Sequence, residues 1–236
     1  MLEKLEFMGN VPRHENVLIM LGKVTDDIHT GPYMVLEYCK NGTLRDWLLA
    51  QKARGGELSA DTADRMTEYG AQIASGMEHL SNNMIIHKKL MSKNVLLNGR
   101  MVAKVAGFGP EGRDAAKDKS RLPTKWMALE VLQDPELNFT AASDVWAYGI
   151  TLWEIYSLGD LPYTTGNKGK LIGMLESGVR PERPTECPEA IYNDMILKCL
   201  YNDPSARPTF PQIKDKLYSY FHPSPDDHGM YYRIDN

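Results

Sequence analysis

The first strong pattern in the chain is a pair of apolar stretches near its start. VLIMLGKV (17–24) and PYMVLEYC (32–39) are separated by the polar segment TDDIHTG (25–31). Runs of β-formers bounded by turn residues predict two neighbouring strands joined by a turn. A second pair, VLLN (95–98) and MVAKVAG (101–107), surrounds an Asn-Gly-Arg turn and predicts a short hairpin.

Elsewhere the apolar positions follow a helical period. The block DVWAYGITLWEIYSL (144–158) is apolar nearly all round, which predicts a helix buried in a core. It is shorter than the roughly 20 residues that span a bilayer, and it contains Asp144 and Glu154. A few strands followed mostly by helices predict a mainly α fold with a small β element. Other helices are expected after Gly42, from Ser59, and at about 167–177, 188–200 and 208–221.

Composition narrows the classes of function. The chain has 236 residues and a net charge of −4, so neither nucleic acid nor an anionic membrane is an expected partner. Cys39, Cys187 and Cys199 form no C-x-x-C pair, which favours a reducing compartment and buried thiols. No signal peptide or membrane segment is apparent, and a cytoplasmic location is expected.

Several longer motifs follow one another in a fixed order. They are MVLEYCKNGTLRDWL (34–48), AQIASGMEHL (71–80), IIHKKLMSKNVLL (85–97), VAGFGP (105–110) and SDVWAYGITLWEI (143–155). In this order they resemble the hinge, long helix, catalytic loop, metal-binding turn and central helix of protein kinases, specifically receptor-type tyrosine kinases. The resemblance runs from about residue 5 to 221. It implies a kinase C-terminal lobe with the hinge and the last strands of the N-terminal lobe.

The same resemblance divides the chain into three parts. Residues 1–38 correspond to the end of the regulatory helix, the last small-lobe strands and the start of the hinge. Residues 39–221 correspond to the C-terminal lobe, and 222–236 are expected to form a flexible tail. No G-x-G-x-x-G loop or V-A-I-K lysine precedes the first strands, so most of the small lobe is expected to be missing. The family's helix glutamate falls at Glu3 or Lys4, which leaves that position open.

The catalytic positions depart from the family. The resemblance places Lys89 where the catalytic-base Asp stands, Gly107 where the metal-binding Asp stands, and Asn94 at the metal-binding Asn; His87 matches the loop His. A charged lysine accepts no proton, and loss of a general base costs about 10²–10⁴ in rate. Glycine supplies no metal ligand. No catalytic site is therefore expected to be intact, and Asn94 is expected to serve as a hydrogen-bonding strut.

The hinge and the scaffold positions match more closely. Leu36 corresponds to the gatekeeper and Glu37, Tyr38 and Cys39 to the adenine-binding backbone, although tight nucleotide binding is not expected. No cofactor is expected, and ATP with Mg²⁺ would be used only by a divergent kinase. The resemblance also implies an ion pair between Glu130 and Arg207, and an Asp144 that binds the backbone amides of the catalytic loop.

Two further features are open to more than one interpretation. The loop lysines with their neighbours could bind an anion or form a solvated face, and the second is favoured because charge runs are usually solvated; these residues are His87, Lys88, Lys89, Lys93 and Lys104. Tyr231 and Tyr232 resemble a docking motif for SH2 domains, but an inert tail is favoured. Between Gly109 and Ala128 there is no tyrosine, so a phosphotyrosine switch is not expected there.

Together these patterns predict a tyrosine-kinase-like pseudokinase. It would act by protein–protein interaction, with an active tyrosine kinase or an SH2 protein as partner, and without phosphoryl transfer. One alternative is a divergent tyrosine kinase whose small lobe lies upstream. The other is a truncated product with no selected function.

Overall fold

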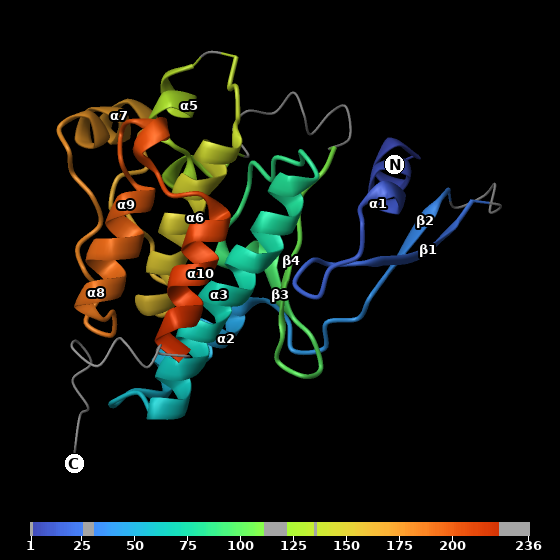
Figure 1. The fold of residues 1–236 in the computed structure, drawn as a ribbon, viewed down its shortest axis with the longest axis horizontal. Helices are drawn as coiled ribbons and strands as arrows, with labels where there is room; N and C mark the ends of the chain where they lie inside the picture. The colour runs from blue at the N-terminus through green and yellow to red at the C-terminus, as the bar shows by residue number, and fades with distance from the viewer. Residues whose placement is uncertain (1, 26–30, 111–121, 135, 222–236) are drawn as a thin grey trace.

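Helices form most of the chain and gather at one end, while a small sheet and one helix lie at the other (Figure 1). The computed structural model describes residues 2–25, 31–110, 122–134 and 136–221. The mainly α fold with short strands is therefore confirmed. The helices are α1 Leu2–Asn10, α2 Leu44–Arg54, α3 Ala60–Asn82, α5 Leu129–Gln133, α6 Ala141–Tyr156, α7 Lys168–Glu176, α8 Glu189–Ile191, α9 Leu197–Cys199 and α10 Phe210–Phe221.

The strands form the two hairpins that the apolar runs predict. β1 (Met20–Val24) pairs with β2 (Tyr33–Leu36), and β3 (Val95–Leu97) pairs with β4 (Ala103–Val105), both antiparallel. The first hairpin has an irregular register between Met20 and Gly22, which leaves Leu21 without an opposite residue. All four strands are shorter than the apolar runs that contain them, because the ends of those runs lie in turns and connecting segments.

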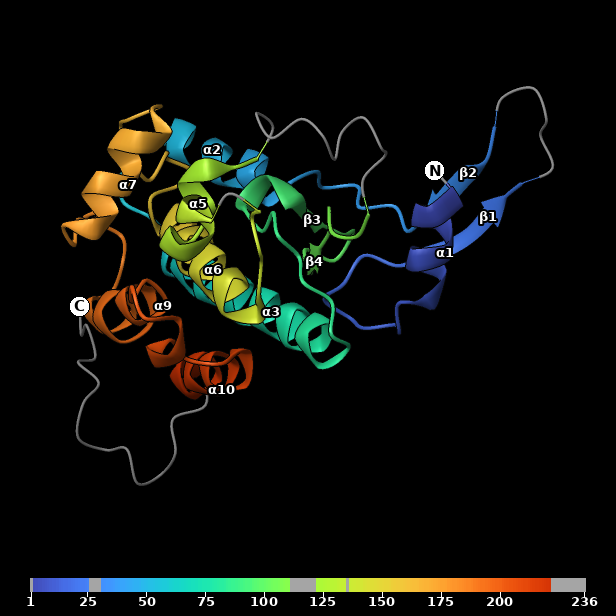
Figure 2. The same cartoon turned by 90° about the horizontal axis from the view of Figure 1, so that it is seen from above.

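The helix α6 is the centre of the helical core (Figures 1 and 2). From Ser143 to Tyr156 each of its residues is buried, as the apolar block predicts. Its start is fixed by a capping box, in which Thr140 and Ser143 bond each other's backbone amides. α3 packs against α6 and also against α10 and β4, so the long helix joins the core to the second hairpin.

Helix α3 begins where the sequence predicts, because the Ser59 side chain caps the Thr62 amide. The expected helix at 188–200 is divided into α8, a π-helical turn at Tyr192–Ile196, and α9. The short helix α5 was not predicted, since five residues carry little periodic signal. Residues 222–236, including Tyr231 and Tyr232, lie outside the described part of the chain.

Candidate functional site

The loop between α3 and β3 is bonded to one buried carboxylate on the central helix. Asp144, on α6, accepts hydrogen bonds from the backbone N–H of His87 at 2.6 Å and of Lys88 at 2.9 Å. Burial raises the pKa of Asp144 to about 7, and the two N–H donors act in the opposite direction. Each oxygen of the carboxylate accepts one N–H, and these two bonds favour the ionised form against the effect of burial. The central helix therefore fixes the shape of the loop.

Asn94 closes the loop from within. Its side-chain nitrogen donates to the Lys89 carbonyl at 2.6 Å, and its own carbonyl accepts from the Ala106 amide at 2.8 Å. The Lys89 amide in turn donates to Nδ1 of His87 at 3.3 Å. Asn94 thus joins the two strand-flanking segments, and only its side-chain oxygen remains as an uncharged ligand atom for a cation.

Gly107 stands directly against Asn94. A Cβ built at this glycine would lie 3.0 Å from Cγ and 3.2 Å from Oδ1 of Asn94. The backbone φ of Gly107 is 81°, a value that residues with a side chain rarely adopt. The spacing G-x-G-x-x-G does occur at residues 107–112, but Phe108 in the middle of it is buried in a ring cluster. Gly107 and Gly109 therefore belong to the turn that follows β4, and Gly112 lies outside the described residues.

The donor set does not fit the Mg²⁺ ion that kinase-like chemistry uses. Magnesium requires several oxygen ligands, usually with at least one carboxylate. Asn94 provides one amide oxygen, Gly107 provides none, and Lys89 adds a positive charge to the same loop. Among the residues that the structure describes, no group of three or more His, Cys, Asp and Glu side chains has metal-site geometry.

The His87 ring is buried against an aromatic side chain and is not part of the charged surface. Phe108 meets the rings of Phe7 and His87 edge-on, with centroids 6.2 Å and 5.9 Å apart. Burial, with a smaller contribution from the positive charge of Lys89, lowers the pKa of His87 to about 4. At neutral pH His87 is uncharged, so it leaves the set of cationic residues considered for an anion site.

A cavity of about 590 Å³ opens between α1 and the loop. Lys88 and Lys89 line it from the loop side, and Glu3 lines it from α1. Lys4, the other candidate for the family's helix glutamate, is not among the lining residues. The apolar part of the wall consists of Phe7, Met84, Ile85, Ile86, Leu122 and Phe139.

The hinge is tied to β4 by an ion pair that sequence analysis missed. Lys104 Nζ lies 3.0 Å from Oε2 of Glu37, and Lys104 is only 5% exposed. The other oxygen of Glu37 accepts the Ile19 amide at 2.9 Å, and the Glu37 amide donates to the Ile19 carbonyl at 3.0 Å. This pair neutralises the charge of Lys104, which argues against a role for Lys104 in an anion site. Sixty-seven positions separate the partners, and no local pattern links them.

The remaining hinge positions are more open. Leu36 is half-exposed, the Tyr38 side chain is 84% exposed, and burial raises the pKa of the Cys39 thiol. The Cys39 carbonyl accepts the Gly42 amide, which turns the chain into α2. These positions lie on a connecting segment, and their use in nucleotide binding remains a prediction.

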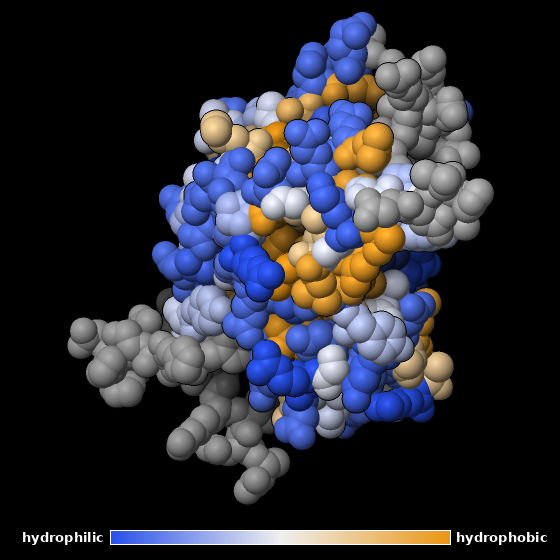
Figure 3. All heavy atoms as spheres, turned by 90° about the vertical axis from the view of Figure 1, so that its right-hand side faces the viewer, coloured by the Kyte–Doolittle hydropathy of each residue, from blue (hydrophilic) through white to orange (hydrophobic). Residues whose placement is uncertain are grey.

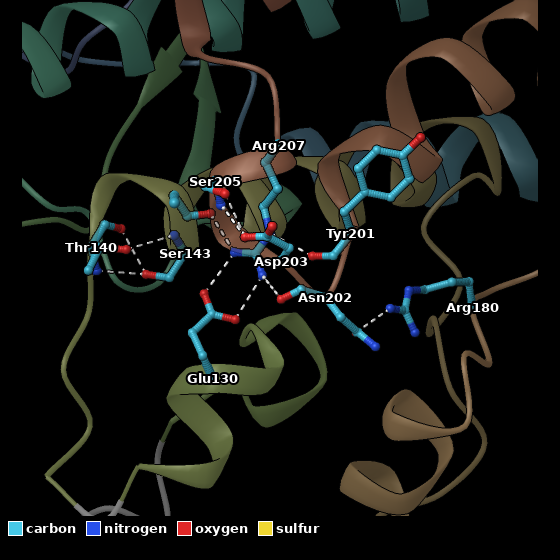
Figure 4. Close-up of polar contacts among 10 residues, drawn as sticks. Glu130, Thr140, Ser143, Arg180, Tyr201, Asn202, Asp203, Ser205 and Arg207 are labelled. Atoms are coloured by element: carbon cyan, nitrogen blue, oxygen red, sulfur yellow. Dashed lines mark hydrogen bonds and ion pairs between the residues drawn. The ribbon is translucent and has the colours of Figure 1, made fainter.

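Glu130 and Arg207 form a two-pronged ion pair (Figure 4). The Arg207 nitrogens Nη1 and Nη2 donate to the two Glu130 oxygens at 2.7 and 2.8 Å, while Nε donates to the Tyr201 carbonyl. The Arg207 side chain is 1% exposed. Its guanidinium and that of Arg180 lie 5.0 and 4.9 Å from the ring centroid of Trp146 on α6. The pair therefore joins α5, the chain before α10, and the central helix.

Comparison with known proteins places most of the chain in one family. The family model for protein tyrosine and serine/threonine kinases matches residues 1–217. Fibroblast growth factor receptor 2 of Dugesia japonica is 37% identical over 230 residues, which include 92% of this chain and 25% of that protein. The chain thus spans a quarter of the length of this relative. In the described part of the chain, no helix has the length and apolar character to cross a membrane.

Proposed function

Because the chain belongs to the family of protein tyrosine and serine/threonine kinases, we propose that it is a receptor-tyrosine-kinase-like pseudokinase that acts by binding a protein partner. One observation carries this proposal. The catalytic loop keeps the backbone bonds to Asp144 and Asn94, while the two positions that need carboxylates hold Lys89 and Gly107.

The chemical argument rests on charge. Phosphoryl transfer depends on metal ions that neutralise the phosphates and on a carboxylate that orients the attacking hydroxyl. In this chain the position of the orienting carboxylate holds Lys89, a cation, and the position of the metal ligand holds Gly107, which has no side chain. Loss of the metal ligand removes several kcal/mol of transition-state stabilisation, and the loss of a base adds to it. An Asp at position 107 would also have to displace the Asn94 side chain.

A binding role is supported by apolar side chains on the small sheet. Val24 and Tyr33 are paired across the hairpin, Val35 lies two residues beyond Tyr33, and all three are between 45% and 48% exposed. These three residues are called the sheet face below. Figure 3, which looks onto this end of the molecule, shows apolar side chains gathered around a hollow. Contiguous apolar surface is typical of interaction sites.

The partner that we propose is an active tyrosine kinase domain. Titrating the chain into such a domain should give a saturable complex and change the rate at which that domain phosphorylates a peptide. Val35→Lys, which places a charge on the sheet face, should weaken the complex tenfold or more. Leu161→Lys is the matched control, because Leu161 is 54% exposed and lies just after α6 in the helical body. Equal effects of both substitutions would exclude the sheet face, and no complex would exclude this partner.

A further inference from the structure

We propose that His14 and His79 form an acid-sensitive contact between α3 and the segment that leads from α1 to β1, and that proton uptake by this pair releases the segment. Residues 11–19 are called the linking segment below. The inference goes beyond the proposed function and does not depend on which partner the chain binds. It rests on the geometry of two imidazole rings, on the hydrogen bond that each ring makes and on the charges around them.

The two imidazole rings lie against each other although they are far apart in the chain. His14 is in the linking segment, and His79 is in the last turn of α3. Their ring centroids are 4.7 Å apart and their planes are inclined by 21°, which is a stacked arrangement. Both side chains are partly exposed, so protons from solvent reach them. Two neutral rings can pack in this way, whereas two imidazolium cations at this distance repel each other.

The hydrogen bonds of the pair fix which ring nitrogen carries the proton. The Asn16 amide donates to Nδ1 of His14 at 3.0 Å, so this nitrogen carries no proton. Nε2 of His79 lies 2.9 Å from the Pro12 carbonyl oxygen, which only accepts, so Nε2 carries the proton. The next proton on His14 therefore binds at Nδ1 and breaks the bond to Asn16. Protonated His79 keeps its bond to Pro12 and faces His14 with a positive charge.

The bond between Asn16 and His14 adjoins the attachment of the linking segment to β4. The Asn16 carbonyl accepts the Val105 amide at 2.8 Å, and the Leu18 amide donates to the Val105 carbonyl at 2.9 Å. Residues 16–18 thus lie beside β4 in a parallel bridge. Loss of the acceptor on His14 would loosen the chain at the point where it passes from the helical body to β1.

The charged groups around His14 come from its own segment, from α3 and from β4. Burial lowers the pKa of His14 below its ordinary value, and His79 and Lys104 act in the same direction. Glu15 and Glu78 act against this shift but do not reverse it. The unfolded chain therefore binds this proton more readily than the folded chain. The stability that neutral His14 contributes is present above pH 6.5 and is lost as the pH falls below that value.

Each of the two glutamates already has a cation beside it. Oε2 of Glu78 lies 2.6 Å from Nζ of Lys214, and Oε1 of Glu15 lies 3.8 Å from Nη2 of Arg100. These cations reduce the compensation that the carboxylates offer to a protonated His14. Acid therefore acts on this contact as a net loss of attraction.

The first test is an NMR titration of the whole chain from pH 8 to pH 5. The Asn16 amide and the His14 ring should shift with one midpoint below pH 6.5, because the proton binds the nitrogen that accepts the amide. In His14→Asn the Asn16 amide should not titrate with that midpoint, since an asparagine oxygen accepts the amide two residues on without titrating. Separate midpoints for the amide and the ring would overturn the inference.

Variants of His79 test whether the rings act as a pair. His79→Phe keeps an aromatic ring and removes its charge, so the midpoint of His14 should rise. His79→Gln, which keeps a donor for the Pro12 carbonyl, should give a rise in the same direction. Circular dichroism verifies that each variant is folded. A His14 midpoint that is the same in the wild type and in both variants would contradict a role for the pair.

The second test measures release of the linking segment with a glutamyl endopeptidase at pH 7.5 and pH 5.0. Cleavage after Glu15 is compared with cleavage after Glu57, which lies in an exposed loop before α3 of the same molecule. The ratio of the two should rise at least fivefold at the lower pH in the wild type and less than twofold in His14→Asn. A ratio that stays constant in the wild type, or that rises equally in the variant, would overturn the inference.

Discussion

Glu154 illustrates how one buried side chain connects segments that are distant in sequence. Its carboxylate accepts the Ser92 amide at 2.9 Å, the Ser92 hydroxyl at 2.7 Å and the Trp126 indole N–H at 2.8 Å. Burial raises the pKa of Glu154, and these donors partly offset that effect. The residue thus holds the catalytic-like loop and the segment before α5 against α6.

Two substitutions of Glu154 should differ sharply. Glu154→Gln keeps an oxygen for the two N–H donors and an amide that can donate to the Ser92 hydroxyl, so the free energy of unfolding at pH 7 should change by less than about 1 kcal/mol. Glu154→Ala leaves buried donors unpaired and should cost about 3 kcal/mol or more. Urea denaturation measures both, and similar losses would contradict this description of the site.

The buried imidazole of His87 predicts a pH dependence. Its pKa is about 4 in the folded chain and about 6.5 when unfolded, so the unfolded state binds more protons between these values. The stability that neutral His87 contributes is present above pH 6.5 and is lost as the pH falls toward 4. Asp144, whose pKa is raised to about 7, contributes in the opposite direction over an overlapping range.

Comparison with a His87→Gln variant isolates the histidine, because Asp144 is common to both proteins. The stability of the wild type relative to the variant should fall by roughly 2 kcal/mol between pH 7 and pH 5. Denaturation at the two pH values gives this difference. A difference that is unchanged with pH would show that His87 is not buried in its neutral form.

The sequence predicted some of these residues but not others. Asp144 and Asn94 stand at recognisable places in a motif, so their contacts to the loop could be expected. The Glu37–Lys104 pair and the Glu154 contacts join positions far apart in the chain, and only the folded backbone brings them together. The neutral state of His87 also depends on burial that no local pattern reveals.

At the scale of elements, close helix packing depends on particular glycines. A Cβ at Gly149, in the middle of α6, would lie 2.6 Å from Cβ of Cys199 on α9. Gly173, on α7, would meet nothing within 4 Å. Both are helical glycines, so helix propensity favours alanine equally at the two positions.

Gly149→Ala should therefore destabilise the chain by about 1–3 kcal/mol, since α6 and α9 must separate. Gly173→Ala should stabilise it by up to about 1 kcal/mol, because alanine is the better helix former. Thermal unfolding of the two variants measures the contrast. Stabilisation by Gly149→Ala would contradict the described contact between the helices.

The Glu130–Arg207 pair connects elements through geometry as well as charge. Arg207→Lys keeps the charge but loses the forked donors, and it should cost at least about 2 kcal/mol. Lys52→Ala removes the exposed pair with Asp160 and should cost less than about 1 kcal/mol. Equal losses in chemical denaturation would show that the burial of Arg207 adds nothing.

Sequence patterns predicted elements best where a regular apolar pattern extended over many residues. The apolar block 144–158 predicted α6, and Ser59 marked the start of α3. The π-helical turn at Tyr192–Ile196 and the short helix α5 depend on packing with neighbours, so the periodicity did not reveal them. The irregular register at Leu21 was equally invisible, because it arises from pairing between strands.

At the scale of the whole molecule, the scaffold of a kinase-like lobe surrounds a site with altered charges. Asp144, Glu154 and Arg207 keep the loop and helices in place, and we propose that Lys89 and Gly107 stand where carboxylates act in the family. The division of the chain into 1–38, 39–221 and 222–236 stays a prediction. Tyr231 and Tyr232, for which an inert tail is favoured over a docking motif, lie outside the described residues.

The central claim is that this chain binds partners without transferring phosphate. It is tested most directly by the initial rate of transfer from γ-labelled ATP, with Mg²⁺, to a tyrosine peptide and to the chain itself. We expect no incorporation above that of an Asn94→Ala variant prepared in parallel, while an active receptor kinase domain labels the same peptide. Incorporation that requires Mg²⁺ and disappears in the Asn94→Ala variant would contradict the claim.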